Sequence, residues 1–427
     1  GNNNTAIGYE SLKANTTGNN NVAIGHAALT LNTVGINNTA VGFCALKSNT
    51  TGVNNVALGL NALKLNTTGH SNVAIGASAL IDNTEGNYNT ALGLESLFKN
   101  TTGDGNVAFG YQSLHSSVTA NYNVAIGFRA MCATTTGKEN VAVGHNTLFT
   151  NTTGARNAAI GYQALCSNVT GDENVALGYE TMKSNTSGQR NVAVGMNALR
   201  NNTIGQYNVS VGYDSMYNST TGECNTAVGN AALFSNTTGI RNTAIGYESL
   251  KANTTGHSNT AVGFKALEDN TSGQSNTAVG FCAMCNNTTG ISNTAVGVRA
   301  GMLNLYGTKN SSLGESALQN NTVGGHNVAM GYQALVSSAG GAWNTAVGTC
   351  ALYTTLNYYN TAVGANAGKL QGTQSAKYNI YLGYNAGCDL TTGAGNVIIG
   401  TVQPESNTGN RQLKIAGYDG TTTTTWI

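Results

Sequence analysis

The sequence has little charge, almost no proline and no long hydrophobic run. Asp, Glu, Lys and Arg make up 9% of its 427 residues and the net charge is +1. This balance predicts no basic surface for nucleic acid and no acidic field for cations. Pro404 is the single proline, and no run of 18 apolar residues occurs, so no membrane-inserted segment is predicted. Disorder is not expected either, because aliphatic residues recur at regular spacing.

What the chain does have is a repeat of 17 residues. One glycine falls in strict register from Gly8 through Gly25 to Gly348, and the pattern continues with altered spacing to Gly400. A short fixed period means that one small structural unit is stacked on itself. We therefore expect a repeat domain over residues 1–400. Residues 401–427 then form a non-repeat segment, as a cap or as a transition to a further domain.

A single repeat, residues 4–20, predicts the fold class. β-Branched residues fill its first segment, and glycine-containing bends follow at Gly8 and Gly18. Seventeen residues are too few for a helical hairpin. The prediction is an all-β fold, a parallel β-solenoid (β-roll) of about 24 turns. Equivalent positions in successive turns form columns, which we name by their first residue.

Strand alternation then predicts which columns face the core. Thr5 and Ile7 are expected to point inward and Ala6 outward, and the Leu12 column is expected to be a second interior column. An outward Ala6 column without charge indicates a surface that packs against another chain. The alternative is that Ala6 fills a tight interior corner.

Asparagine occupies the Asn4 column in every turn. Such a column is either an outward array of ligand-binding amides or an asparagine ladder inside the coil, in which each amide bonds its copies above and below. The ladder is the preferred interpretation. Its first members are Asn4, Asn21, Asn38, Asn55, Asn72, Asn89, Asn106, Asn123, Asn140, Asn157, Asn174 and Asn191.

A second asparagine column has the pattern of N-glycosylation acceptors on a polar bend. If they are glycosylated, the chain carries a stripe of sugar along one edge. The alternative, which we favour, is that Asn-Thr-Thr-Gly is turn chemistry. The acceptor motifs begin at Asn15, Asn49, Asn66, Asn100, Asn151, Asn168, Asn185, Asn236, Asn253, Asn270 and Asn287.

An aromatic column follows the first glycine of many turns. Aromatic columns can bind sugars, but more often their rings stack between neighbouring turns. The members are Tyr9, Phe43, Tyr111, Phe128, Tyr162, Tyr179, Tyr213, Tyr247, Phe264, Phe281, Tyr332 and Tyr384.

Residues for metal or catalytic chemistry are scattered. The six histidines lie at four different positions of the repeat, and the Cys282-x-x-Cys285 pair has no second pair to complete a zinc site. No two of the eight cysteines are 17 residues apart, so unpaired thiols are predicted. We expect no metal, no cofactor and no enzymatic activity.

The run from Asn21 to Leu29, Asn-Val-Ala-Ile-Gly-His-Ala-Ala-Leu, resembles the head repeat of YadA-like trimeric autotransporter adhesins, and similar repeats are found in phage tail fibres. The resemblance covers residues 1–400 and implies a left-handed roll with three chains around one axis. It is weak for function, because one fold serves many functions. The tail, with Gly409–Gly417 and the threonine run Thr421–Thr425, looks more like the distal part of a phage fibre.

We therefore expect a structural fibre or adhesin rod, outside the cell, on its surface or on a virion. Its partners would be copies of itself and a cell-surface glycan or protein receptor, with no nucleic acid. Two alternatives remain open. One is a self-assembling, glycan-coated extracellular filament. The other is an ice- or surface-binding solenoid, suggested by the abundant threonine.

Overall fold

The computed structural model describes residues 1–370, 376–418 and 421–425. Contacts divide the chain into two units, residues 1–214 and 215–427, and each is described by itself. Both are parallel β-solenoids with one three-residue strand per turn through β24, and none of the described residues is helical.

The first unit contains the strands β1 (Thr5–Ile7), β2 (Val22–Ile24), β3 (Thr39–Val41), β4 (Val56–Leu58), β5 (Val73–Ile75), β6 (Thr90–Leu92), β7 (Val107–Phe109), β8 (Val124–Ile126), β9 (Val141–Val143), β10 (Ala158–Ile160), β11 (Val175–Leu177), β12 (Val192–Val194) and β13 (Val209–Val211).

The second unit contains β14 (Thr226–Val228), β15 (Thr243–Ile245), β16 (Thr260–Val262), β17 (Thr277–Val279), β18 (Thr294–Val296), β19 (Ser311–Leu313), β20 (Val328–Met330), β21 (Thr345–Val347), β22 (Thr361–Val363), β23 (Ile380–Leu382), β24 (Val397–Ile399), β25 (Leu413–Tyr418) and β26 (Thr423–Thr425).

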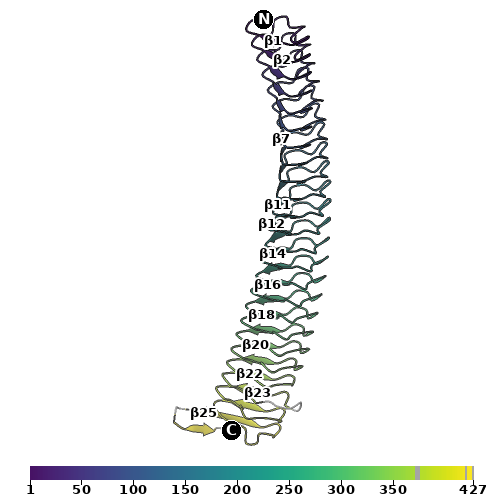
Figure 1. The fold of residues 1–427 in the computed structure, drawn as a ribbon. Helices are drawn as coiled ribbons and strands as arrows, with labels where there is room; N and C mark the ends of the chain where they lie inside the picture. The colour runs from purple at the N-terminus through teal and green to yellow at the C-terminus, as the bar shows by residue number, and fades with distance from the viewer. Residues whose placement is uncertain (371–375, 419–420, 426–427) are drawn as a thin grey trace. The chain divides into compact units, whose positions relative to one another are not determined.

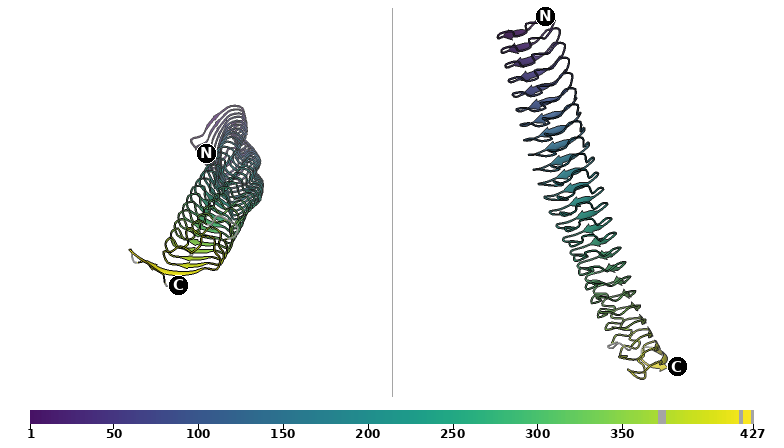
Figure 2. Two further views of the ribbon diagram at one scale, coloured as in Figure 1. Left: turned by 90° about the horizontal axis from the view of Figure 1, so that it is seen from below. Right: turned by 90° about the vertical axis from the view of Figure 1, so that its right-hand side faces the viewer.

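Within each unit, consecutive strands pair in parallel and in register. Val22 lies beside Thr39 in the first unit, and Thr226 lies beside Thr243 in the second. The strands of each unit therefore lie one above the next, as Figure 1 shows and Figure 2 repeats from two further sides. The bends stack as well, since the Leu29 amide donates to the carbonyl of Ala45 at 3.1 Å. Each turn is thus hydrogen-bonded to its neighbours around much of its circumference.

The C-terminal segment continues this sheet before it leaves the pattern. β25 pairs in parallel with β24, so that Val397 lies beside Leu413. β26 then pairs antiparallel with β25. The segment expected as non-repeating, 401–427, therefore adds one more strand to the stack, at residues 413–418.

The strands face the opposite way from the prediction. Ala23 and Ala40 are fully buried, whereas Ile24 is 36% exposed and Leu58 is 45% exposed. The Thr5 and Ile7 columns therefore point outward and the Ala6 column faces the core. The inward Ala6 column faces the Leu12 column, and in most turns a leucine there leaves room for only a small side chain opposite. The larger Ile398 of the Ala6 column lies beside Gly387, where the Leu12 column has no side chain.

The Leu12 column is interior, as predicted. Its members from Leu29 on are buried, and they pack with the Ala6 column and with the alanines of the Ser11 column. Leu29 and Leu46 have φ values of 49° and 51°, in the left-handed region that larger residues rarely adopt. The tight bend that returns the chain to the core therefore places a leucine in an unfavourable backbone conformation at most turns.

Candidate binding surfaces

The Asn4 column lies inside the coil at the start of each strand. Asn38 shows the pattern: its Nδ2 donates to the carbonyl of Gly52 at 2.9 Å, and its Oδ1 accepts from the backbone N–H of Asn55 at 3.0 Å. The Nδ2 of Asn55 also donates to that Oδ1, at 3.2 Å. From Asn21 on, the column is buried, and only Asn4, in the terminal turn, is half-buried. These contacts are those of an internal asparagine ladder, and they leave no amide for an external ligand.

The Asn15 column forms a second internal ladder. Asn49 donates from Nδ2 to the Oδ1 of Asn32 at 2.8 Å and to the carbonyl of Gly52 at 3.0 Å, so both of its amide protons are used. The acceptor asparagines proposed from sequence are fully buried, apart from the half-buried Asn15. A glycan on Nδ2 would replace one of these protons and would need space that the coil does not have. In the folded chain these asparagines are therefore inaccessible to a glycosylating enzyme, and turn chemistry accounts for the motif.

The outward side of the strands, formed by the Thr5 and Ile7 columns, is an apolar surface that we call the sheet face. In every turn of the repeat, its two columns contain Val, Ile, Leu, Met, Phe, Ala, Thr or Ser and no charged residue. Ile160 is 46% exposed in the first unit, and Met330 is 41% exposed in the second. Each unit therefore presents a continuous apolar stripe to its surroundings.

The aromatic column lies next to the sheet face, one residue beyond the strand glycine. Its rings stack between neighbouring turns, as expected: Tyr111 and Phe128 lie 5.2 Å apart between ring centroids, and Tyr162 and Tyr179 lie 5.1 Å apart. These rings are also substantially exposed, for example Tyr179 at 47%. Stacking covers their faces and leaves their edges open, so the column widens the apolar stripe.

Charged residues gather on the following bend. Glu248 accepts from Lys251 at 2.6 Å and from Lys265 of the next turn at 3.1 Å. The hydrogen bond from Lys251 is the main cause that lowers the pKa of the Glu248 carboxyl. Glu180 is paired in the same way with Lys183. The pairs of Glu248 with Lys251 and of Glu180 with Lys183 connect positions three residues apart within one bend.

Cys282 and Cys285 occupy the same two positions and form a disulfide, with Cα atoms 4.8 Å apart. The prediction that all the cysteines are unpaired is therefore wrong for this pair. It considered distances between successive turns, whereas the bend brings together residues within one turn. The other six cysteines are free thiols.

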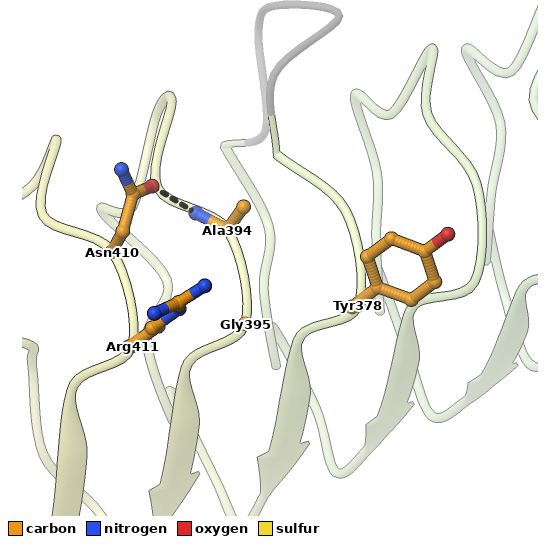
Figure 3. Close-up of a pocket in the computed structure, with 5 residues that line it drawn as sticks. All are labelled: Tyr378, Ala394, Gly395, Asn410 and Arg411. Carbon is orange, nitrogen blue, oxygen red and sulfur yellow. Dashed lines mark hydrogen bonds between the residues drawn. The ribbon is translucent and has the colours of Figure 1, made fainter.

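A hollow of about 480 Å³ lies beside the last turns of the second unit. Figure 3 shows its lining: the ring of Tyr378 on one side, the guanidinium of Arg411 on the other, and Gly395 between them. The backbone N–H of Ala394 donates to the Oδ1 of Asn410 at 2.7 Å, which fixes the amide at the rim. Sequence reasoning missed this hollow, because the place of Gly395 between Tyr378 and Arg411 of the neighbouring turns is visible only once the turns are aligned in space.

Groups of three or more His, Cys, Asp or Glu side chains that could hold a metal ion do not occur among the described residues. The same part of the chain contains no helix of the length and apolar character needed to cross a membrane. No protein-family model matches the sequence, and no curated protein matches it.

Proposed function

We propose that this chain is a structural fibre protein in which three copies of a left-handed β-roll assemble around one axis through their sheet faces. The observation that carries the proposal is the apolar, uncharged sheet face of each unit. The adhesin-like repeat supports the same arrangement. The fibre acts outside the cell or on a virion as a rigid spacer for attachment, and it has no catalytic role.

The physical argument is that a parallel sheet is normally covered on both faces. Here the inner face is covered by the Leu12 column, while the outer face exposes an aliphatic side chain in most turns. Monomeric soluble proteins rarely expose contiguous apolar patches of more than a few hundred Å². Burial of such a surface contributes roughly 25 cal/mol per Å². A second and a third copy of the same stripe match it in length and period, so self-association is the simplest way to cover it.

Sedimentation of the purified chain tests the assembly. The expected mass is three times the 43.7 kDa of one chain. Ile160→Glu places a charge on the sheet face and is expected to shift the protein toward monomer. Ile204→Glu is the matched control, because Ile204 is similarly exposed, at 50%, but lies on a bend.

The two variants should differ only in assembly, with similar circular dichroism spectra. A wild-type chain that sediments as a monomer at micromolar concentration would overturn the proposal. So would equal effects of the two substitutions on the sedimenting mass.

Ice binding is a second candidate, and one observation favours it. The outward Thr5 column holds threonine in five successive turns, at Thr226, Thr243, Thr260, Thr277 and Thr294. However, the neighbouring Ile7 column is aliphatic, so only one of the two columns offers hydroxyls. A thermal hysteresis measurement separates the candidates: activity in the isolated chain supports ice binding, and none is expected from a fibre.

A further inference from the structure

We call the residues that directly precede the asparagines of the Asn4 column the Asn3 column. Near the end of the second unit, this column contains a stack of aromatic rings. His326 and Trp343 lie 3.9 Å apart between ring centroids, with planes 4° apart. Tyr359 and Tyr378 lie 5.0 Å apart with parallel planes. These residues have φ values near 60°, so this backbone position accepts large aromatic side chains.

At Gly395, the next member of the column, the ring is missing. A Cβ built on Gly395 would have only the Cγ of Arg411, at 3.6 Å, within contact distance. The space of one side chain is therefore open between Tyr378 and Arg411 (Figure 3). Gly105 is the glycine of the same column in the first unit, and it can be compared with Gly395. A Cβ built on Gly105 would lie 2.8 Å from the ring of Tyr122, which leans over the glycine. The gap at Gly105 is thus filled by the protein itself, whereas the gap at Gly395 is not.

The polar groups around the gap are hydrogen-bond donors. Arg411 is exposed and enters no ion pair among the residues that the structure describes. Lys377, beside Tyr378 in the chain, is a second exposed cation. The Oδ1 of Asn410 is used by Ala394, which leaves its Nδ2 as the available side of the amide. An aromatic face, a guanidinium and an amide N–H are the groups that suit a ring bearing an anion and hydroxyls.

We propose that the gap between Tyr378 and Arg411 binds one acidic pyranose residue of a saccharide. Successive turns are about 4.8 Å apart, so the missing position leaves about 9.6 Å between its two neighbours. One six-membered ring placed midway lies about 4.8 Å from each, close to the spacing of the rings already in the column. Its apolar face stacks on Tyr378, and its carboxylate pairs with the guanidinium of Arg411. This inference rests on the proposed attachment role and assigns a chemical class to the receptor.

The test is a titration of the full chain with methyl glucuronide, followed by saturation-transfer NMR, with methyl glucoside as the neutral counterpart. Gly395→Tyr fills the gap with the residue that the column already has at Tyr378. Arg411→Gln removes the charge. Each is expected to weaken binding of the glucuronide by about tenfold or more. Ser292→Tyr is the matched control, because Ser292 belongs to the same column with φ of 58° but lies away from the gap.

Equal binding by wild type and Gly395→Tyr would overturn the site, and equal binding of glucoside and glucuronide would overturn its acidic specificity. No detectable binding of the glucuronide to the wild-type chain would also overturn the proposal. Sedimentation of the same samples separates this result from the fibre proposal, since a chain that assembles but binds no saccharide fails only here.

Discussion

At the residue scale, the ladder of the Asn15 column explains why glycine recurs on the bend. A Cβ added at Gly18 would collide with the Oδ1 of Asn15 in its own turn and with the carbonyl oxygen of Gly35 in the next. Ala120 stands at this position in the turn where Ser117 replaces the ladder asparagine. The shorter serine removes the Oδ1 that the alanine methyl would meet. The two departures from the repeat are therefore physically linked.

The serine at position 117 interrupts the ladder of the Asn15 column. The Oδ1 of Asn100, the Oγ of Ser117 and the Oγ1 of Thr134 are buried without a hydrogen-bond partner among the described residues. Buried polar atoms without partners cost about 1–3 kcal/mol each. The turns around residue 117 should therefore be a weak point of the first unit.

Restoring the ladder there requires both substitutions. Ser117→Asn alone is expected to gain nothing, because its Oδ1 would collide with the Ala120 methyl group. Ser117→Asn with Ala120→Gly should stabilise the chain by about 1–2 kcal/mol, since the new Nδ2 can donate to Asn100. Urea unfolding of the four proteins in this cycle measures the coupling. Additive effects of the two single substitutions would contradict the linkage.

At the scale of one turn, the side chains of two facing columns, Ala6 and Leu12, have complementary sizes in the core. Alanine in the Ala6 column faces leucine in the Leu12 column through most of both units. Tyr381 replaces the alanine in β23, and the Leu12 column then has glycine at Gly368 and Gly387. A Cβ on Gly387 would lie 2.5 Å from the Cε1 of Tyr381, and one on Gly368 would lie 2.7 Å from its Cδ2. One large side chain therefore fills the volume that two leucines occupy elsewhere.

Tyr381→Ala should destabilise the second unit by about 3–5 kcal/mol, because it leaves a cavity beside both glycines. Adding Gly387→Leu should recover part of this loss by recreating the usual alanine and leucine pair. The backbone permits it, since Gly387 has φ of 56° and Leu335 of the same column has φ of 51°. Gly387→Leu alone should destabilise through the clash with Tyr381. Thermal unfolding of the three variants checks this order, and a double variant no better than Tyr381→Ala would contradict it.

At the scale of the whole molecule, the buried polar side chains of the described residues are those of Asn, Ser and Thr, which do not titrate in the ordinary pH range. The carboxylates whose pKa is lowered, such as Glu180 and Glu248, lie on the bends in ion pairs. A lowered pKa in the folded state means that the carboxylate contributes stability above its ordinary pKa, and that this contribution is lost as the pH falls. Acid should therefore weaken the bends and leave the ladders intact.

We expect the thermal unfolding midpoint to be nearly constant from about pH 7 to 8. It should fall modestly once the pH drops below about 4.5, which is the ordinary pKa of a glutamate side chain. Glu248→Gln should lower the midpoint at neutral pH and reduce the fall in acid. Glu405→Gln is a suitable control, since no ion pair involving Glu405 occurs among the described residues. A steep loss of structure near pH 6, where carboxylates remain charged, would contradict this view.

The sequence by itself determined the period, the class of fold and the interior position of the Leu12 column. These follow from spacing alone, because in-register stacking brings residues 17 apart side by side and because a bend of fixed length repeats in every turn. The preference for an asparagine ladder also came from the sequence, since a polar residue present in every turn fits an interior that must satisfy backbone groups.

Only the tertiary structure decided which side of each strand is buried. In a three-residue strand, either the middle residue or the two outer residues face the core. The sequence Thr-Ala-Ile is apolar enough for both arrangements. The thin coil selects alanine, since the opposite column already supplies leucine. The same thinness buries the Asn15 column, and the bend joins Cys282 to Cys285 within one turn. The open position at Gly395 likewise depends on what its neighbours in space do, and the period of the sequence carries no information about that.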